Sequence, residues 1–264
     1  MTRDYLMWRL YAPMVSYGEI AVGEQRPTAA YPGKSLIVGL LSACLGISRT
    51  NQDAQNAMAS GYGVAVLQLS GGFPMRDYHT AQAPSRSDLK GRPHATRKDE
   101  LNAVPTRDLQ TILSDRDYRL DAMSVVAVWA REGAPHRLDD LRNALERPVF
   151  TPYIGRRACP VALPFQPMII EGANSLEMAF EAEFLKFEAG LGRNAGQSAG
   201  ARLGRRLPRV DANAWLVCDA DEAGPDADTY IRHDQPAHRG RWQFAPRREA
   251  RIEWRPPSVR EDVT

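Results

Sequence analysis

Short hydrophobic segments alternate with polar connections along the first half of the chain. Residues 5–11 combine aromatic and large apolar side chains, which predicts a strand. After a more polar connection over residues 12–30, nearly every position between Ser35 and Leu45 is apolar, and Gly46 follows. That pattern predicts a helix that is buried on several sides and stops at the glycine.

A second helix and a second strand follow directly. The more polar segment Asn51–Ala59 predicts a helix that Thr50 caps and Gly61 ends. Tyr62–Leu69 predicts another strand, and the glycine pair at residues 71–72 predicts a turn after it.

Residues 77–105 break this alternation, because they are polar and contain Pro84, Gly91, Pro93 and Pro105. Apolar residues show hardly any period there, so we expect a long loop. A structureless loop of this length inside a compact domain is uncommon and is typical of functional or protruding segments.

Residues 122–148 return to a clear pattern. Ala122–Ala130 is almost wholly apolar and predicts a buried strand. His136–Arg147 predicts an amphipathic helix that Pro148 ends, because its leucines share one face. The order strand, helix, strand, connection, strand, helix is the one that a ferredoxin-like unit requires, with its last strand after Pro148.

The pattern therefore predicts an α+β fold in which residues 1–165 form a ferredoxin-like domain and residues 166–264 form a smaller β-rich extension. Within this extension, Glu177–Phe187 and Ala214–Cys218 are predicted as strands. The glycine-, alanine- and arginine-rich residues 190–204 between them predict a flexible insertion.

The composition is that of a globular protein, since 43% of the 264 residues are hydrophobic and 25% are charged. Cys44, Cys159 and Cys218 are too few and too far apart for a disulfide framework or a zinc knuckle, which favours a reducing cytoplasm. The charged N-terminus lacks the apolar core of a signal peptide. The longest nearly apolar run, residues 36–47, falls well short of the roughly 20 residues that cross a bilayer. We therefore expect a cytoplasmic protein with no membrane partner.

The net charge is only +2, but the charge is unevenly distributed. Arginine supplies 30 of the 34 basic residues, and many of the arginines gather in residues 76–107, 193–209 and 232–255. Such clusters are typical of surfaces that bind polyanions. Ordinary solvated faces of an arginine-rich protein are the alternative, and composition alone does not decide between the two.

Three patterns that could indicate cofactor chemistry fail on their spacing. The Gly33-Lys34-Ser35 sequence resembles the end of a phosphate-binding loop, but the glycine required five positions earlier is Thr28. Gly190, Gly192 and Ala195 have the spacing of a dinucleotide-binding turn, but no packing helix follows them. The five histidines show no metal-ligand spacing. We therefore expect neither a metal nor a cofactor.

Two short segments carry the residue types that recognition of single-stranded RNA requires. Arg76–Thr80 alternates charge with an aromatic residue and a histidine at the root of the long loop. In Thr151–Pro160, Gly155 permits close approach of the backbone to a phosphate, two arginines follow it, and Tyr153 offers a stacking face.

Taken together, these segments resemble the CasD family. Proteins of this family are subunits of the type I-E CRISPR surveillance complex Cascade and belong to the RAMP superfamily of RNA-binding proteins. The resemblance covers most of residues 5–164 and part of the C-terminal region. It runs through Leu10–Gly18, Arg26–Thr28, Tyr31–Ser35, Gly39–Ile47, Arg76–Thr80, Tyr153–Arg157 with Cys159-Pro160, and Gln243–Arg247. Tyr17 departs from the family pattern, which often has tryptophan there, and residues 190–204 have no counterpart.

The resemblance implies a ferredoxin-like, RRM-like fold with a protruding thumb at about residues 81–105. It implies a non-catalytic subunit that binds the repeat-derived 5′ tag of the CRISPR RNA, caps a filament of CasC backbone subunits and contacts the large subunit CasA. Target DNA is then met only through the complex, and RNA cleavage belongs to CasE. Carried over residue by residue, the resemblance assigns RNA contact to Arg26, Lys34, Tyr78, His79, Tyr153, Gly155, Arg156 and Arg157.

Two other functions stay open at this point. One is a metal-independent endoribonuclease that processes CRISPR precursor RNA, for which Tyr78, His79, Lys90 and His94 are the acid–base candidates. The other is a general RNA-binding module outside CRISPR. A neighbouring gene for a separate processing nuclease argues against the enzyme, and a genome position with no CRISPR genes nearby favours the general module.

Overall fold

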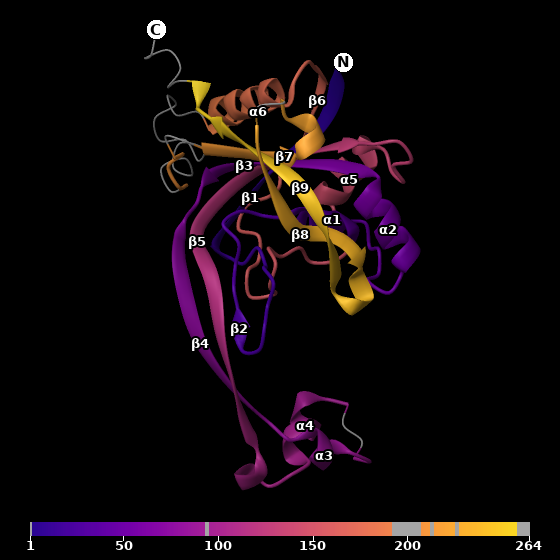
Figure 1. Cartoon of the computed structure of the whole chain (residues 1–264), viewed down its shortest axis with the longest axis vertical. Coiled ribbons are helices and arrows are strands. Elements are labelled where there is room, and N and C mark those ends of the chain that lie inside the picture. Colours follow the sequence, from indigo (N-terminus) through magenta and orange to yellow (C-terminus); the bar gives the residue numbers. More distant parts are fainter. Residues whose placement is uncertain (1, 93–94, 192–206, 212–213, 225–226, 258–264) are drawn as a thin grey trace.

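The computed structural model describes residues 2–92, 95–191, 207–211, 214–224 and 227–257, which form one large, mainly antiparallel sheet (Figure 1). Its strand order is β6-β1-β5-β3-β7-β9-β8, and β2 and β4 also pair with β5. The strands are β1 (Arg3–Val15), β2 (Gln25–Arg26), β3 (Tyr62–Ser70), β4 (Phe73–Ala83), β5 (Gln110–Ala130), β6 (Met168–Ala173), β7 (Ala214–Asp219), β8 (Asp228–His238) and β9 (Gln243–Trp254).

Helices pack on both faces of this sheet, so the predicted mixture of helices and strands around one sheet is confirmed. The helices are α1 (Lys34–Cys44), α2 (Gln52–Ser60), α3 (Arg86–Leu89), α4 (Arg97–Asn102), α5 (Leu138–Glu146) and α6 (Leu176–Leu191), with short 3-10 helices η1 (Thr106–Asp108), η2 (Ala220–Glu222) and η3 (Arg239–Arg241). Side chains of α1, α2 and α5 join the core on one face, and those of α6 join the core on the other. Within the described part of the chain, no helix combines the length and the apolar character needed to span a membrane.

The central strands are apolar on both sides because both faces of the sheet are covered. Along β1, Leu6, Trp8 and Leu10 pack with α1, α2 and α5, whereas Tyr5 and Met7 pack with α6. All five side chains are almost fully buried. Burial of a large apolar side chain stabilises the fold by roughly 1.5–3 kcal/mol, which explains why the strand reads as a continuous apolar segment.

Most elements predicted from the first 150 residues are confirmed within about two residues, namely α1, α2, β3 and α5. The apolar segment Ala122–Ala130 is the second half of β5, and the strand expected after Pro148 is β6, which pairs with β1. One detail is wrong. Asn51, not Thr50, caps α2, because its side-chain oxygen accepts a hydrogen bond from the backbone N–H of Ala54 at 3.2 Å.

The prediction of a strand at Glu177–Phe187 is also wrong, because this segment lies inside helix α6. Its buried positions are 176, 179, 180, 183 and 184, the three- and four-residue spacing of one helix face. One of these positions is Glu183, whose carboxylate is paired with the buried Arg9 at 2.9 Å. A charged residue in the apolar stripe concealed the helical period in the sequence.

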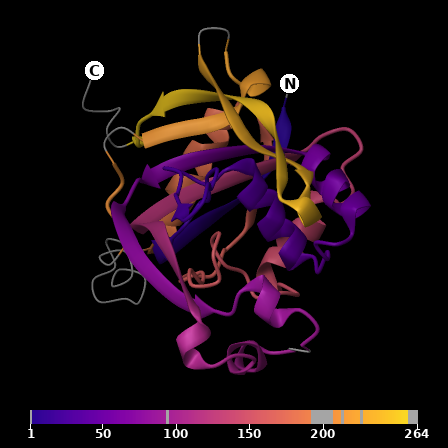
Figure 2. The same ribbon diagram turned by 60° about the horizontal axis from the view of Figure 1, so that its bottom comes forward.

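The polar residues 77–105 do not form a structureless loop. Residues 73–83 are strand β4, which pairs without interruption with residues 110–120 of β5. Most side chains of this hairpin are at least partly exposed, so its strands lack the apolar alternation of a half-buried strand. The hairpin projects away from the rest of the sheet and carries α3 and α4 at its far end (Figures 1 and 2).

The C-terminal strands continue the sheet from β3, through β7 and β9 to β8. The strand predicted at Ala214–Cys218 is confirmed as β7. Of the predicted insertion at residues 190–204, residues 190–191 end helix α6 and the rest lie outside the described residues.

Candidate nucleic-acid interface

Where the hairpin leaves the sheet, β5 is paired on both sides. Tyr78 of β4 lies opposite Asp115 of β5, and Asp77 lies opposite Arg116. On the other side of β5, the two-residue strand β2 places Arg26 beside Arg116. Residues that the chain separates by up to 90 positions therefore meet at the base of the hairpin.

Tyr78 and His79 lie on opposite faces of β4, because successive residues of a strand alternate. Tyr78 shares its face with Arg76 and is 63% exposed. Arg76 pairs with Asp117 across the hairpin at 2.7 Å, and this hydrogen bond lowers the pKa of Asp117. Asp115, opposite Tyr78, adds a negative charge to this face, and the exposed Tyr78 ring is free for stacking.

The His79 face is the more basic of the two. Here Arg116 lies diagonal to His79 and donates from Nε to the hydroxyl of Ser114 at 3.2 Å. His79 itself lies 3.8 Å from the carboxylate of Asp77. Arg116 was not predicted from the sequence, in which the alternation of charge along residues 114–119 was its signal.

The loop at residues 153–160 is held against the end of β1 by Gly155. Its φ of +80° lies in the left-handed region, and a Cβ atom there would lie 1.6 Å from the backbone oxygen of Ser16. Only glycine fits such a position. Beside it, the oxygen of Ile154 accepts a hydrogen bond from the N–H of Ser16 at 3.3 Å. Gly155 therefore permits close contact within the protein, whereas the sequence had led us to expect close approach to a phosphate.

Arg156 fixes the same loop to the base of the hairpin. Its guanidinium donates to the backbone oxygen of Asp117 at 3.0 Å and to that of Arg26 at 2.7 Å, and it lies 4.6 Å from the ring centroid of Tyr118. Arg156 forms no ion pair with a carboxylate among the residues that the structure describes, but its charge helps to lower the pKa of the nearby Asp117 carboxyl. The positive charge is therefore only partly compensated, and the side chain is structurally engaged.

Arg157 and Tyr153 extend from the loop toward solvent. Tyr153 is 41% exposed, and Arg157 is exposed and bonds to no other described residue. The structure thus brings together Arg26, Tyr153, Gly155, Arg156 and Arg157, close to His79 and Arg116. An exposed ring beside uncompensated guanidinium groups has the chemistry of a surface for single-stranded nucleic acid.

Lys34 does not join this surface, and the expectation that its side chain contacts RNA is not supported. The side chain is almost fully buried, with Nζ 3.6 Å from Asp219. Burial lowers the pKa of Lys34, and the charge of Asp219 acts in the opposite direction. The backbone N–H of Lys34 donates to Asp234 at 2.7 Å, so the residue anchors the start of α1 to the C-terminal strands.

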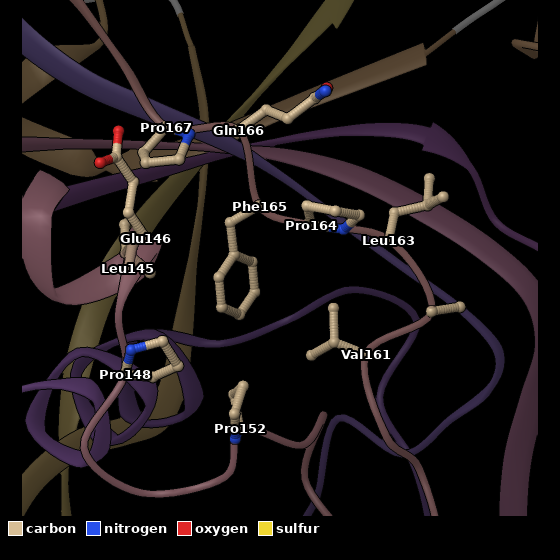
Figure 3. A pocket seen from close by; sticks show the side chains of 11 residues that line it. Leu145, Glu146, Pro148, Pro152, Val161, Leu163, Pro164, Phe165, Gln166 and Pro167 are labelled. Atoms are coloured by element: carbon tan, nitrogen blue, oxygen red, sulfur yellow. The ribbon is translucent and has the colours of Figure 1, made fainter. Parts of the chain in front are cut away.

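The acid–base set considered for an endoribonuclease is not gathered in one place. Tyr78 and His79 face opposite sides of β4, and Lys90 follows α3 at the far end of the hairpin. His94 lies outside the described residues. A pocket of about 630 Å³ next to the loop at residues 153–160 is lined mainly by proline and apolar side chains, with Glu146 as its one ionisable group (Figure 3).

Comparison with known proteins identifies the family. Residues 5–249 match the family described as CRISPR-associated protein (Cas_Cas5). The chain belongs to this family. Over 173 residues it is 32% identical to the CRISPR system Cascade subunit CasD of Escherichia coli strain K12, covering 61% of this chain and 69% of CasD.

Two solved structures share the fold of this Cas5-family protein. A chain of a CRISPR RNA-guided surveillance complex superposes with a TM-score of 0.59 at 22% identity, covering 97% of this chain and 92% of its own. A structure described as a Cas protein superposes with a TM-score of 0.58 at 21% identity, covering 97% and 96%. Both likenesses extend over the hairpin and the C-terminal strands as well as the central sheet.

Proposed function

We propose that this chain is a non-catalytic, cytoplasmic subunit of a type I-E Cascade surveillance complex. It binds the repeat-derived 5′ tag of the CRISPR RNA, caps the CasC backbone filament and contacts the CasA subunit. Target DNA reaches it only through the complex. The observation that carries the proposal is the identity to a Cascade subunit in a chain that matches the Cas5 family over nearly its whole length.

The strand order supports a ferredoxin-like centre for this subunit. The four strands β6-β1-β5-β3 are mutually antiparallel neighbours, and α1 and α5 connect strands that are not adjacent. That is the split arrangement of a ferredoxin-like unit. The β4–β5 hairpin then takes the place of the thumb, which reaches beyond the range of about 81–105 because its strands begin at the sheet.

The RNA contacts that we propose lie at the base of this thumb. Tyr153 and Tyr78 offer rings, Arg157 and Arg116 offer guanidinium groups, and His79 lies beside them. Arg26 and Arg156 contribute positive charge while holding β2, β5 and the loop together. A polyanion fits this surface because aromatic faces bind bases and unpaired arginines bind phosphates.

Co-purification of the tagged chain, followed by sequencing of the bound RNA, tests the proposal. We expect guide RNAs that share one repeat-derived 5′ end, together with other Cascade subunits. RNA without such an end would contradict it. Incubation of the purified chain with repeat RNA is the companion assay, and specific cutting that His79→Ala abolishes would favour the endoribonuclease instead.

Arg157→Ala should reduce the salt dependence of guide-RNA binding and leave the fold intact, because its exposed guanidinium bonds to no described residue. Each phosphate neutralised on a single strand contributes about 0.7 to the slope of log K against log salt. The measurement is a salt titration on the assembled complex. Arg156→Ala is the contrasting variant, since it removes two hydrogen bonds and should lower the Tm. Unchanged affinity and slope in Arg157→Ala would remove this loop from the interface.

Shortening the thumb should separate folding from assembly. Helices α3 and α4 bury no residue, so replacing residues 84–109 with a Ser-Asn-Gly-Ser turn should leave the Tm of the isolated chain nearly unchanged. Assembly on guide RNA should weaken, because the projecting end is lost. Calorimetry of the isolated chain measures the Tm, and gel filtration of the reconstituted complex measures assembly. A large fall in Tm would show that the thumb belongs to the core.

A further inference from the structure

The turn between β8 and β9 lies beside α1 and α2 (Figure 1). Its side chains form a second basic and aromatic surface. Trp242 is the centre of this turn surface, which also includes Arg49, Arg239 and Arg241. Its ring is 61% exposed, and the Arg49 guanidinium lies 4.7 Å from the ring centroid. A stacked arginine on one side leaves much of the indole accessible to another planar group.

The backbone at Trp242 is held in an unfavourable conformation. Its φ is +54°, in the left-handed region that bulky residues rarely adopt. Hydrogen bonds impose this turn, since the N–H of Arg241 donates to His238 Nδ1 at 3.2 Å and that of Trp242 to the oxygen of Arg239 at 3.3 Å. Strained backbone positions cluster at functional sites, so an exposed tryptophan at a position that favours glycine indicates a functional residue.

The arginines of the turn surface lack acidic partners, in contrast to the buried arginines of the ion-pair networks. Arg247 contacts three carboxylates and Arg9 pairs with Glu183. Within the described part of the chain, no ion pair links Arg49, Arg239 or Arg241 to a carboxylate. Positive charge gathered without compensation favours a polyanionic ligand.

Arg239 shows this lack of compensation most clearly. Its guanidinium lies across α1 and donates to the backbone oxygen of Ser35, and Gly39 leaves the space that it occupies. The buried Nε has no hydrogen-bond partner. Burial lowers the pKa of Arg239, and the nearby charge of Arg49 lowers it further. Tyr153 lies near enough to act in the opposite direction on the pKa of Arg239, so the turn surface lies near the loop at residues 153–160.

We infer that the turn surface is a second contact for single-stranded RNA, with Trp242 stacking on a base while Arg49 and Arg241 neutralise phosphates. This inference rests on the proposed function and extends the RNA path from Tyr153 across α1. Stacking on an aromatic ring accepts any base, so the contact is independent of sequence. An acidic protein partner would use the same arginines, and the experiment separates the two.

Trp242→Gly is the decisive variant, because glycine adopts the left-handed turn without strain. The Tm should stay the same or rise. The affinity of the reconstituted complex for fluorescein-labelled guide RNA should fall about five- to 150-fold at every salt concentration, as expected for one lost stacking contact. Arg49→Ala with Arg241→Ala should instead lower the salt slope by up to roughly 1.4. Tyr230→Ala, which removes an exposed ring from the same hairpin, should change neither.

Unchanged RNA affinity in Trp242→Gly would overturn the inference while leaving the proposed function intact, provided that Tyr153→Ala still weakens binding. Loss of another Cascade subunit from the Trp242→Gly complex at unchanged RNA affinity would overturn it in favour of a protein contact. A wild-type complex that binds no guide RNA would instead refute the proposed function.

Discussion

Arg247→Met should lower the free energy of unfolding of this protein by about 3–5 kcal/mol. The guanidinium donates to Asp219, to both oxygens of Asp234 and to Glu249, each at 2.8–2.9 Å. Burial opposes its charge, but the hydrogen bonds and charges of these carboxylates prevail and raise the pKa of Arg247. Methionine fills a similar space and leaves buried carboxylate oxygens without those donors.

The carboxylates around Arg247 also join the C-terminal strands to the rest of the protein. Asp234 on β8 accepts the backbone N–H of Lys34 at the start of α1, and Asp219 on β7 pairs with Arg131 at 2.7 Å. Losing Arg247 therefore removes three ion pairs and also weakens the attachment of the β8–β9 hairpin. A deficit of 3–5 kcal/mol corresponds to a fall in Tm of roughly 6–20 °C for a chain of this size.

Arg248→Met provides the matched control for this prediction. Arg248 is the next residue of β9, is exposed, and makes one hydrogen bond, to the hydroxyl of Thr229 at 3.2 Å. Its loss should change the free energy of unfolding by no more than about 0.5 kcal/mol. Urea unfolding of both variants is the measurement, and equal effects would show that the buried network does not stabilise the fold.

The elements predicted correctly from sequence are those whose local pattern agrees with their burial. α1 and β3 are covered on several sides and read as apolar segments, and α5 places Leu141 and Leu145 on one buried face. The strands of the β4–β5 hairpin were missed because they are stabilised by pairing with each other and not by packing on a core, so they lack an apolar pattern. Helix α6 was misassigned because the buried Glu183 is neutralised by Arg9, which lies 174 residues away.

The same limit applies to the candidate interface. Its aromatic and arginine residues were identified by type, and most of them do meet at the base of the hairpin. Lys34 was assigned to RNA by carry-over from the family resemblance, yet its partners Asp219 and Asp234 lie about 200 residues further along the chain. The local sequence carries no information about such partners. Residue type alone therefore assigns some buried charged side chains, such as Lys34, to the exposed surface.

Gly155→Ala should lower the free energy of unfolding by roughly 2–4 kcal/mol and should weaken guide-RNA binding as well. Part of the loss is the strain of a left-handed alanine, and part is the hydrogen bond between Ser16 and Ile154, which breaks when the loop moves away. Movement is unavoidable, because the new Cβ would lie 1.6 Å from the backbone oxygen of Ser16. Tyr153 and Arg157 would move with the loop.

Gly133→Ala separates the two causes, since its φ of +76° is nearly the same but no atom lies within 4 Å of the new Cβ. Strain alone should then cost about 1 kcal/mol and leave RNA binding unchanged. Thermal unfolding and RNA titration of both variants in parallel measure the difference. If Gly155→Ala lost RNA affinity while matching Gly133→Ala in stability, the glycine would be needed next to the phosphate after all. A large loss of stability accompanied by the loss of affinity would show that Gly155 acts on RNA through the packing of the loop against β1.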